Sequence, residues 1–215
     1  IGSRVFGDLW GSDEAPDGPG RGSWQDTTRT WYVAGEDPFS TYKYAALAAQ
    51  MAFCLKKAGL NDSIDWASEA LDSYNWAISN TKAGDEGVKP AIGYPLRDIR
   101  AFAAASLYRL TGDVQYQNQL KTDVSVVTTS TILRDEARWA PYLYATMPDS
   151  MTADADLSTR FNGALIATAD LFASTSAIRA CRFGGDYYMP MLIGQSTTPL
   201  VFEVIMGYNL CKNSN

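Results

Sequence analysis

The stretch LRDIRAFAAASLYRLTGDVQYQNQL, residues 96–120, decides the fold class. Its first half is rich in alanine and carries apolar residues at helical spacing, which predicts a helix over Arg97–Leu110. Gly112 suits the left-handed residue that ends a helix, and Asp113 suits the N-cap of a following helix that begins near Val114. The stretch therefore predicts two helices joined by a tight turn.

The preceding part of the chain repeats this pattern. A helix capped by Ser40 or Thr41 and ended by Gly59 is predicted within STYKYAALAAQMAFCLKKAG, and a second helix within SIDWASEALDSYNWAISN. The predicted apolar faces consist of Tyr44, Leu47, Ala48, Met51, Ala52 and Leu55 in the first helix, and of Ile64, Ala67, Leu71, Tyr74 and Ile78 or Ala77 in the second. The glycine joints at Gly59 and Gly112 lie about 53 residues apart, which indicates repeated helical hairpins.

Three further helices complete the prediction. EARWAPYLYATM predicts a short fifth helix, broken or kinked at Pro141, DADLSTRFNGALIATADLFASTSA predicts a long sixth, and LVFEVIMGYNL predicts a seventh. Residues 1–30 are rich in Gly, Asp, Pro and Ser without apolar periodicity, so they are predicted to be a loop-like lead-in. Residues 31–215 are predicted to form one all-α region of helical hairpins.

Composition excludes several classes of function. The chain has 215 residues and a net charge of −6, and its basic residues form no stripe, so nucleic acid is not an expected partner. No apolar run reaches about 18 residues, so no membrane span or membrane partner is expected. The chain contains no histidine, which excludes a Ser-His-Asp or Cys-His mechanism and a histidine-bound metal within it.

Three stretches, in this order, resemble the catalytic domain of family 9 glycoside hydrolases. YKYAALAAQMAFCLKKAG with DWASEALDSYNWAISN is similar to an alanine-rich helix pair of that family. YPLRDIRAFAAASLYRLTGDVQY is similar to the family's DE/DDxxxAAAxLYRATGDxxY motif, and GGDYYMPMLIGQSTTPLVFEVIMGYNL to a later stretch that leads into a further helix. The resemblance spans residues 24–210.

The resemblance implies an (α/α)6 toroid and hydrolysis of β-1,4-linked glucans such as cellulose, with inversion. It also implies a catalytic base from an Asp-x-x-Asp motif and a catalytic glutamic acid after a histidine-rich segment. The surroundings of Asp8 and Asp13 do not match the first, and the lack of histidine rules out the second. We therefore expect the middle part of a longer, extracellular or secreted catalytic domain, with its catalytic residues unassigned and some apolar helix faces uncovered.

Aromatic residues are the candidates for substrate binding. The flat C–H faces of a sugar ring pack on aromatic rings, and in a toroid such rings belong near the helix ends. The candidates in or beside predicted loops are Trp24, Trp31, Tyr94, Trp139, Tyr187 and Tyr188. Trp66, Trp76 and Tyr108 lie within predicted helices, so they are expected to pack in the core.

An inverting glycosidase also needs two carboxyl groups about 6.5–9.5 Å apart, a distance that sequence does not give. The acidic candidates are Asp98, Asp135, Glu136, Asp154, Asp156 and Asp186. Asp154 and Asp156 stand just ahead of a predicted helix, and Asp135 with Glu136 opens another. N-capping is therefore the expected role of these four residues, and no catalytic pair is assigned.

Asp98 is the one candidate metal ligand. It stands where the family often has an acidic pair that contributes calcium ligands in some members. The next residue here is Ile99, and a hard cation that prefers six to eight oxygens would lack a ligand. Helix capping is the expected role of Asp98, and no cofactor is expected, since calcium would rest on this residue alone.

Two other functions fit the same residues. A non-catalytic helical-repeat binding module would present a concave surface and would also lack an acid and a base. Another (α/α) toroid enzyme acting on polysaccharides, such as a lyase or an unsaturated glucuronyl hydrolase, would need an Asp/His site. For the glycoside hydrolase, the expected partners are a polysaccharide or oligosaccharide substrate and the remainder of its own catalytic domain.

Overall fold

The computed structural model describes residues 5–6, 32–33, 35–87, 95–148, 150–178 and 201–213, and within them the chain is almost entirely helical. The α-helices are α1 (Pro38–Ala58), α2 (Trp66–Asn80), α3 (Leu96–Thr111), α4 (Val114–Asp123), α5 (Trp139–Ala145), α6 (Ala155–Ala177) and α7 (Val201–Asn213). Two 3-10 helices, η2 (Ala83–Asp85) and η3 (Asp135–Arg138), and a two-residue antiparallel pair, β1 (Val5–Phe6) with β2 (Tyr32–Val33), complete the regular structure. The predicted all-α class is confirmed.

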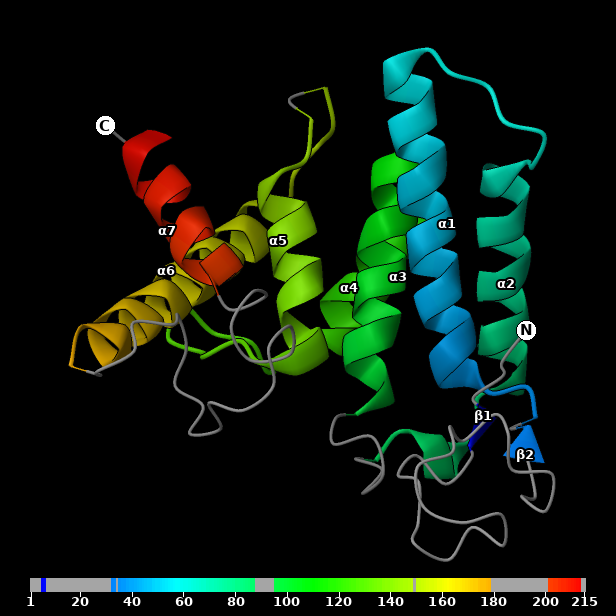
Figure 1. The fold of residues 1–215 in the computed structure, drawn as a ribbon, viewed down its shortest axis with the longest axis horizontal. Helices are drawn as coiled ribbons and strands as arrows, with labels where there is room; N and C mark the ends of the chain where they lie inside the picture. The colour runs from blue at the N-terminus through cyan, green and yellow to red at the C-terminus, as the bar shows by residue number, and fades with distance from the viewer. Residues whose placement is uncertain are drawn as a thin grey trace, which may run out of the picture.

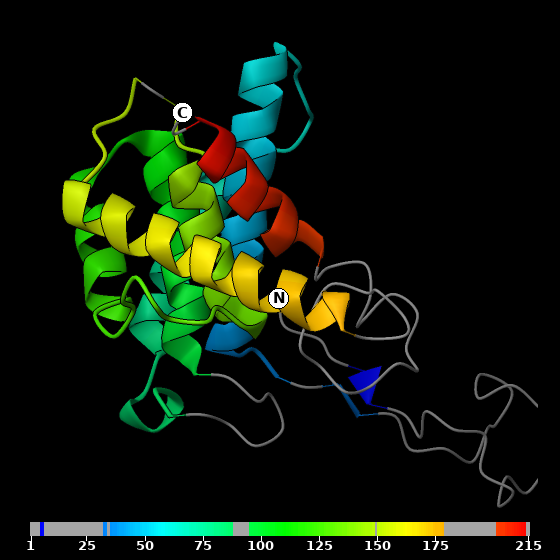
Figure 2. The ribbon, with the colours of Figure 1, turned by 90° about the vertical axis from the view of Figure 1, so that its left-hand side faces the viewer.

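The helices alternate in direction along the chain (Figure 1). α1, α3 and α5 lie side by side in a row and run in the same direction, from the lower edge of the view to the upper one. α2 returns beside α1, and α4 packs against α3. α6 crosses the row obliquely with α7 next to it (Figure 2). The result is two helical hairpins, α1–α2 and α3–α4, with α5 extending the row and α6 and α7 packed across its end.

α3 is the centre of the core. All residues from 101 to 108 are buried, so this helix is enclosed on every side, as expected for a helix that is apolar around its circumference. α1 packs along it and buries Ala45, Ala46 and Ala49 completely, while α3 contributes the equally buried Ala103 and Ala104. Because these buried side chains are short, α1 and α3 can pack closely against their neighbouring helices.

Local sequence signals set most helix ends as predicted. Gly59 and Gly112 end α1 and α3 in the left-handed conformation, with φ of 67° and 74°. Asp113 caps α4 by accepting a hydrogen bond from the backbone N–H of Gln115 at 3.0 Å. Asp154 caps α6 in the same way. The tight joint between α3 and α4 is therefore confirmed.

Two predicted details of the helix ends are wrong. Asp37 caps α1 by accepting from the N–H of Ser40 at 2.8 Å, because Pro38 starts the helix one turn earlier than the predicted cap. The fifth helix is not broken at Pro141. The change from 3-10 to α geometry precedes it, at Trp139, and Pro141 lies in the first turn of α5, where a missing N–H costs no helical hydrogen bond.

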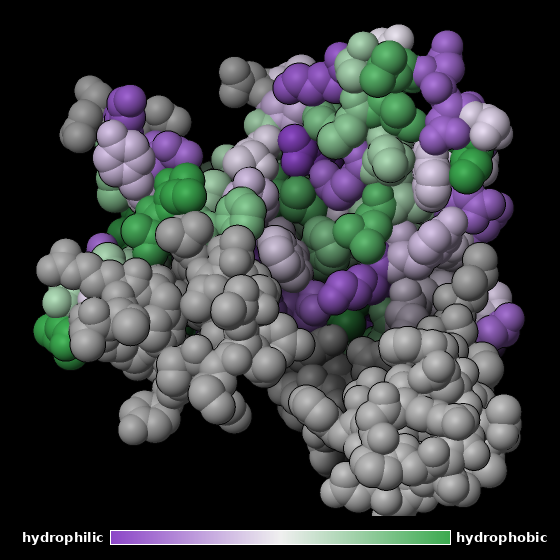
Figure 3. All heavy atoms as spheres, viewed as in Figure 1, coloured by the Kyte–Doolittle hydropathy of each residue, from purple (hydrophilic) through white to green (hydrophobic). Residues whose placement is uncertain are grey.

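The predicted apolar faces of α1 and α2 are only partly correct. Leu47 and Met51 are 55% and 44% exposed, and hydrophobic side chains are visible along α1 in Figure 3. Ile64 and Ile78 are also exposed. The faces that pack inward are instead formed by alanines and by tyrosines such as Tyr42 on α1.

A glycine in α6 offers a first test of this packing. A Cβ atom on Gly163 would lie 2.6 Å from the Cβ of Thr129 and 2.8 Å from its Cα. The segment that leads to Thr129 is held against α6, because Arg160 of that helix donates hydrogen bonds to the carbonyls of Val124 and Val127 at 2.9 and 3.0 Å. We expect Gly163→Ala to lower the free energy of unfolding by about 1–3 kcal/mol, measured by urea denaturation.

The control for this experiment is Gly87→Ala, since a Cβ atom there meets no other atom within 4 Å. Alanine favours a helix over glycine by about 0.8–1.0 kcal/mol, so an unhindered Gly163→Ala would stabilise the protein. A Gly163→Ala variant that is more stable than the wild type would contradict the close approach of Thr129 to α6.

Candidate functional site

A hollow of about 370 Å³ opens between α1, α3 and the start of α5. Its lining residues are Lys43, Leu47, Phe102, Asp135, Glu136, Arg138 and Trp139, and we call it the Trp139 hollow. Its lining residues come from the first half of α1, the first half of α3, the 3-10 helix η3 and the first residue of α5. These segments bring apolar, basic and acidic side chains together at one surface.

The aromatic wall of the hollow is built from α3 and α5. Trp139 is half-buried, and its ring lies 6.1 Å from the ring of Phe102, at an angle of 37°. The guanidinium of Arg138 lies 4.8 Å from the centre of the Trp139 ring, which is within the range of a cation–π contact. The indole is therefore held between an apolar and a cationic neighbour while part of it faces solvent.

The charged side of the hollow is built around Glu136. Its Oε1 accepts from the Lys43 ammonium at 2.6 Å, which ties η3 to α1. The Glu136 side chain is 11% exposed, and its second oxygen, Oε2, has no hydrogen-bond partner although it is buried. Arg138 likewise leaves its Nε unpartnered. A buried acceptor and a buried donor without partners are costly, and a ligand with hydroxyl groups could satisfy both after small side-chain rotations.

Asp135 begins η3 with an unusual backbone. Its φ of 47° is the only positive value at a non-glycine residue among the described residues. Aspartate tolerates this left-handed conformation better than most residues, and such conformations are concentrated at functional sites. The predicted N-capping role of Asp135 and Glu136 is wrong, because the N-cap position of η3 is Arg134 and no side chain caps it.

Asp98 lies in the first turn of α3, one turn before Phe102. Burial raises the pKa of its carboxyl to about 6, against the lowering effect of Arg97, and the carboxylates of Asp123, Asp135 and Glu136 raise it further. Asp98 is therefore able to exchange a proton near neutral pH. Its predicted capping role is wrong, because α3 has no side-chain cap. Within the described residues, no group of three or more His, Cys, Asp or Glu side chains could hold a metal ion.

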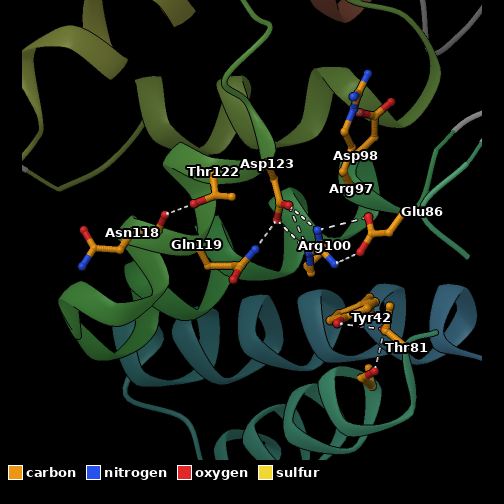
Figure 4. Close-up of polar contacts among 11 residues, drawn as sticks. Tyr42, Thr81, Glu86, Arg97, Asp98, Arg100, Asn118, Gln119, Thr122 and Asp123 are labelled. Carbon is orange, nitrogen blue, oxygen red and sulfur yellow. Dashed lines mark hydrogen bonds and ion pairs between the residues drawn. The ribbon is translucent and has the colours of Figure 1, made fainter. Parts of the chain in front are cut away.

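A second polar cluster surrounds Arg100 on α3 (Figure 4). Its guanidinium donates to Asp123 of α4 at 2.6 and 3.0 Å and to Glu86, which follows η2, at 2.6 Å. Gln119 adds a bond to Asp123 at 3.1 Å. Burial lowers the pKa of Arg100, but the hydrogen bonds and charges of Asp123 and Glu86 together outweigh it, so the pKa is raised. Because the buried donors and acceptors of this cluster are paired with one another, it joins α3 to α4 and offers little to a ligand.

The structure brings three of the sequence candidates together, since Trp139, Asp135 and Glu136 share the hollow. Asp154 caps α6 as predicted, whereas Asp156 pairs with Arg160 at 2.9 Å within the same helix. Trp66 and Trp76 pack half-buried against the core, and Tyr108 is buried, as predicted. The remaining candidates, Trp24, Trp31, Tyr94, Tyr187, Tyr188 and Asp186, lie outside the described residues.

Sequence reasoning missed Lys43, Arg138 and Glu203, which complete the polar contacts of the hollow. Lys43 and Arg138 carry no motif, so no sequence signal would have identified them. Glu203 does carry one, because it is the single charged residue within the apolar run LVFEVIM. A carboxylate in such a run is expected to be buried and paired, and Glu203 is 3% exposed and bonded to Arg138 at 3.0 Å.

The described residues thus define an all-α protein of helical hairpins with a mixed aromatic and charged hollow at the start of its row of helices. No protein-family model matches the chain. A search of curated proteins finds no match either. No helix among the described residues is long and apolar enough to cross a membrane.

Proposed function

We propose that this chain is part of a glycoside hydrolase of the family 9 type, acting on β-1,4-linked glucan, outside the cell. In this proposal the chain supplies helices of an (α/α)6 toroid and aromatic residues that contact the sugar. The catalytic acid and base come from the remainder of the same catalytic domain. The three motifs that resemble the family, found in the family's order, are the sequence support for this assignment.

The arrangement of hairpins supports the toroid. A ring of helical hairpins puts one helix of each hairpin inside, so that inner helices are neighbours and run parallel. α1, α3 and α5 have this relation, and α2 and α4 are the returning helices. Exposed apolar residues on α1 and α7, such as Leu47, Phe202 and Ile205, fit helix faces that a complete ring would cover.

The observation that carries the glucan assignment is the composition of the Trp139 hollow. A neutral sugar presents apolar C–H faces together with hydroxyl groups that both donate and accept hydrogen bonds. Trp139 offers a ring for the first, while Glu136 and Arg138 offer an acceptor and a donor for the second. We propose that one glucose unit stacks on Trp139.

The test is the binding of cellohexaose to the 215-residue chain, measured by isothermal titration calorimetry. We expect Trp139→Ala to weaken binding by about tenfold or more, equivalent to about 1.4 kcal/mol. Trp66→Phe is the control. Trp66 begins α2, at the end of the α1–α2 hairpin that lies away from the start of α1, and it does not line the hollow. Equal affinities of the wild type and Trp139→Ala, or no binding by the wild type, would contradict the assignment.

Hydrolysis is tested separately. The chain alone is expected to release no reducing ends from carboxymethyl-cellulose, because the proposal takes both catalytic carboxyl groups from elsewhere in the domain. Reducing ends released by the chain alone would show that the acid and base lie within these 215 residues. Asp98 and Glu136 would then be the first residues to replace.

One observation favours a second candidate, a toroid enzyme or a binding module for acidic polysaccharides. Two cations, Lys43 and Arg138, line the hollow, and cations of this kind bind the carboxylates of uronic acids. Each is already paired with a glutamate, at 2.6 and 3.0 Å, which lowers its availability for an anionic sugar. A tri-galacturonate that binds more tightly than cellohexaose in the same titration would favour this candidate.

A further inference from the structure

Arg138 joins two parts of the molecule that are distant in sequence. Its Nη1 donates to Oε1 of Glu203 on α7 at 3.0 Å, while its guanidinium lies 4.8 Å from the centre of the Trp139 ring. Arg138 and Trp139 line both the hollow and the contact between α5, α6 and α7. One side of each residue therefore faces the candidate site, and the other faces α7.

Glu203 is an unusual residue for a helix contact. Its side chain is 3% exposed, and it lies among the apolar groups of Leu165, Phe202 and Met206. Burial raises the pKa of its carboxyl, opposed by a backbone hydrogen bond and by Arg138. A buried carboxylate is costly unless it is paired, and a hydrophobic residue of similar size would pack in such a contact without that cost. The charge thus calls for an explanation beyond packing.

The position of Arg138 supplies that explanation. An arginine side chain has many rotamers, and a cation over an indole face is held only weakly by that contact. The ion pair with Glu203 restricts Arg138 to the rotamer in which it covers the ring of Trp139. Without the carboxylate, Arg138 would be free to turn toward solvent or toward Glu136, whose Oε2 has no partner.

We propose that Glu203 is a positioning residue for the Trp139 hollow, fixing the indole of Trp139 through Arg138. The identity of the ligand in this inference rests on the proposed function. The effect of Glu203 on the position of Trp139 does not depend on any ligand. It assigns α7 a part in building the binding surface in addition to covering α6.

The experiment follows Trp139 directly by fluorine NMR. The chain is labelled with 5-fluorotryptophan at its six tryptophans, and the resonances of Trp139, Trp66 and Trp76 are assigned from single Trp→Phe variants. We expect Glu203→Gln to shift the Trp139 resonance by more than its line width and to leave those of Trp66 and Trp76 in place. We also expect this variant to weaken cellohexaose binding by about threefold to tenfold.

Leu210→Ala is the control for a purely structural role of α7. Leu210 packs partly buried against the core, two turns from Glu203 on the same helix, so its truncation weakens the docking of α7 without removing the ion pair. We expect the Trp139 resonance to stay in place in this variant. An unchanged resonance in Glu203→Gln, or an equal shift in Leu210→Ala, would overturn the inference.

The two proposals fail in different ways. If the Trp139 resonance shifts in Glu203→Gln but the wild type does not bind cellohexaose, Glu203 keeps its positioning role and the glucan assignment falls. If the wild type binds cellohexaose with an affinity that depends on Trp139, and Glu203→Gln changes neither affinity nor resonance, the glucan assignment stands and the role of Glu203 falls.

Discussion

Replacing Arg100 by methionine is expected to lower the free energy of unfolding by about 3–5 kcal/mol. The Asp123 side chain is 1% exposed, and Arg100 is its one charged partner among the contacts drawn in Figure 4. Methionine fills a similar volume but leaves the carboxylate buried without a counter-charge. The same change releases Glu86, whose side chain is 43% exposed, so the cost arises mainly at Asp123.

The measurement is urea denaturation at neutral pH. Arg97→Met is the matched control, because Arg97 is 44% exposed and its ion pair with Asp98 is long, at 3.8 Å. Surface substitutions of this kind change stability by about 0.5 kcal/mol or less. A second replacement, Asp123→Leu in the Arg100→Met background, should recover part of the loss, because it removes the stranded charge. A loss below about 1 kcal/mol in Arg100→Met would show that water reaches Asp123.

Truncating Phe161 to alanine is expected to cost about 3–5 kcal/mol as well. Phe161 lies on α6, is fully buried, and meets the ring of Tyr144 on α5 edge-on with 5.5 Å between ring centres. Alanine would leave a cavity between the two helices, and the loss of the ring contact adds to the cost.

Phe202→Ala is the control for Phe161→Ala, since Phe202 is 48% exposed and its truncation leaves no enclosed cavity. The core residues of α1 to α6 form one continuous cluster, so Arg100→Met and Phe161→Ala should both shift a single unfolding transition. Two separate transitions, each sensitive to only one variant, would mean that α1–α4 and α5–α7 unfold independently.

Helix ends were the part of the fold best predicted from sequence, because their signals are local. Gly59 and Gly112 need no neighbour to favour the left-handed conformation, and Asp113 needs only the backbone that follows it. The start of α1 was misplaced because two local signals compete there. Asp37 followed by Pro38 outweighs Ser40, since the proline is already suited to the first turn.

The buried faces were predicted less well, because apolar periodicity gives most weight to large residues. In α1 the large residues Leu47 and Met51 are exposed, while Ala45, Ala46 and Ala49 are fully buried. Alanine occurs both on surfaces and in cores, so whether a given alanine is buried depends on which helix packs against it in the folded protein. That information resides in tertiary contacts and is absent from the local pattern.

The candidate site was predictable in its aromatic part only. Trp139 stood out because it lies at the junction of a loop with a helix, and the structure places it in the hollow. The pairing of Lys43 with Glu136 joins residues 93 positions apart, and no pattern in either segment indicates it. Asp135 and Glu136 were interpreted as N-caps because acidic residues at the start of a helix usually have that role. In the structure Glu136 instead forms a tertiary ion pair with Lys43.

The fully buried alanines of α1 and α3 leave little freedom to change side-chain size in either direction. Shortening one of them to glycine costs about 2 kcal/mol, from about 1 kcal/mol of helix propensity and about 0.8 kcal/mol of lost apolar burial. Enlarging Ala46 or Ala104 would overpack a region in which α3 is buried on every side, at a cost of about 1–3 kcal/mol. We therefore expect these positions to accept alanine better than either a smaller or a larger residue.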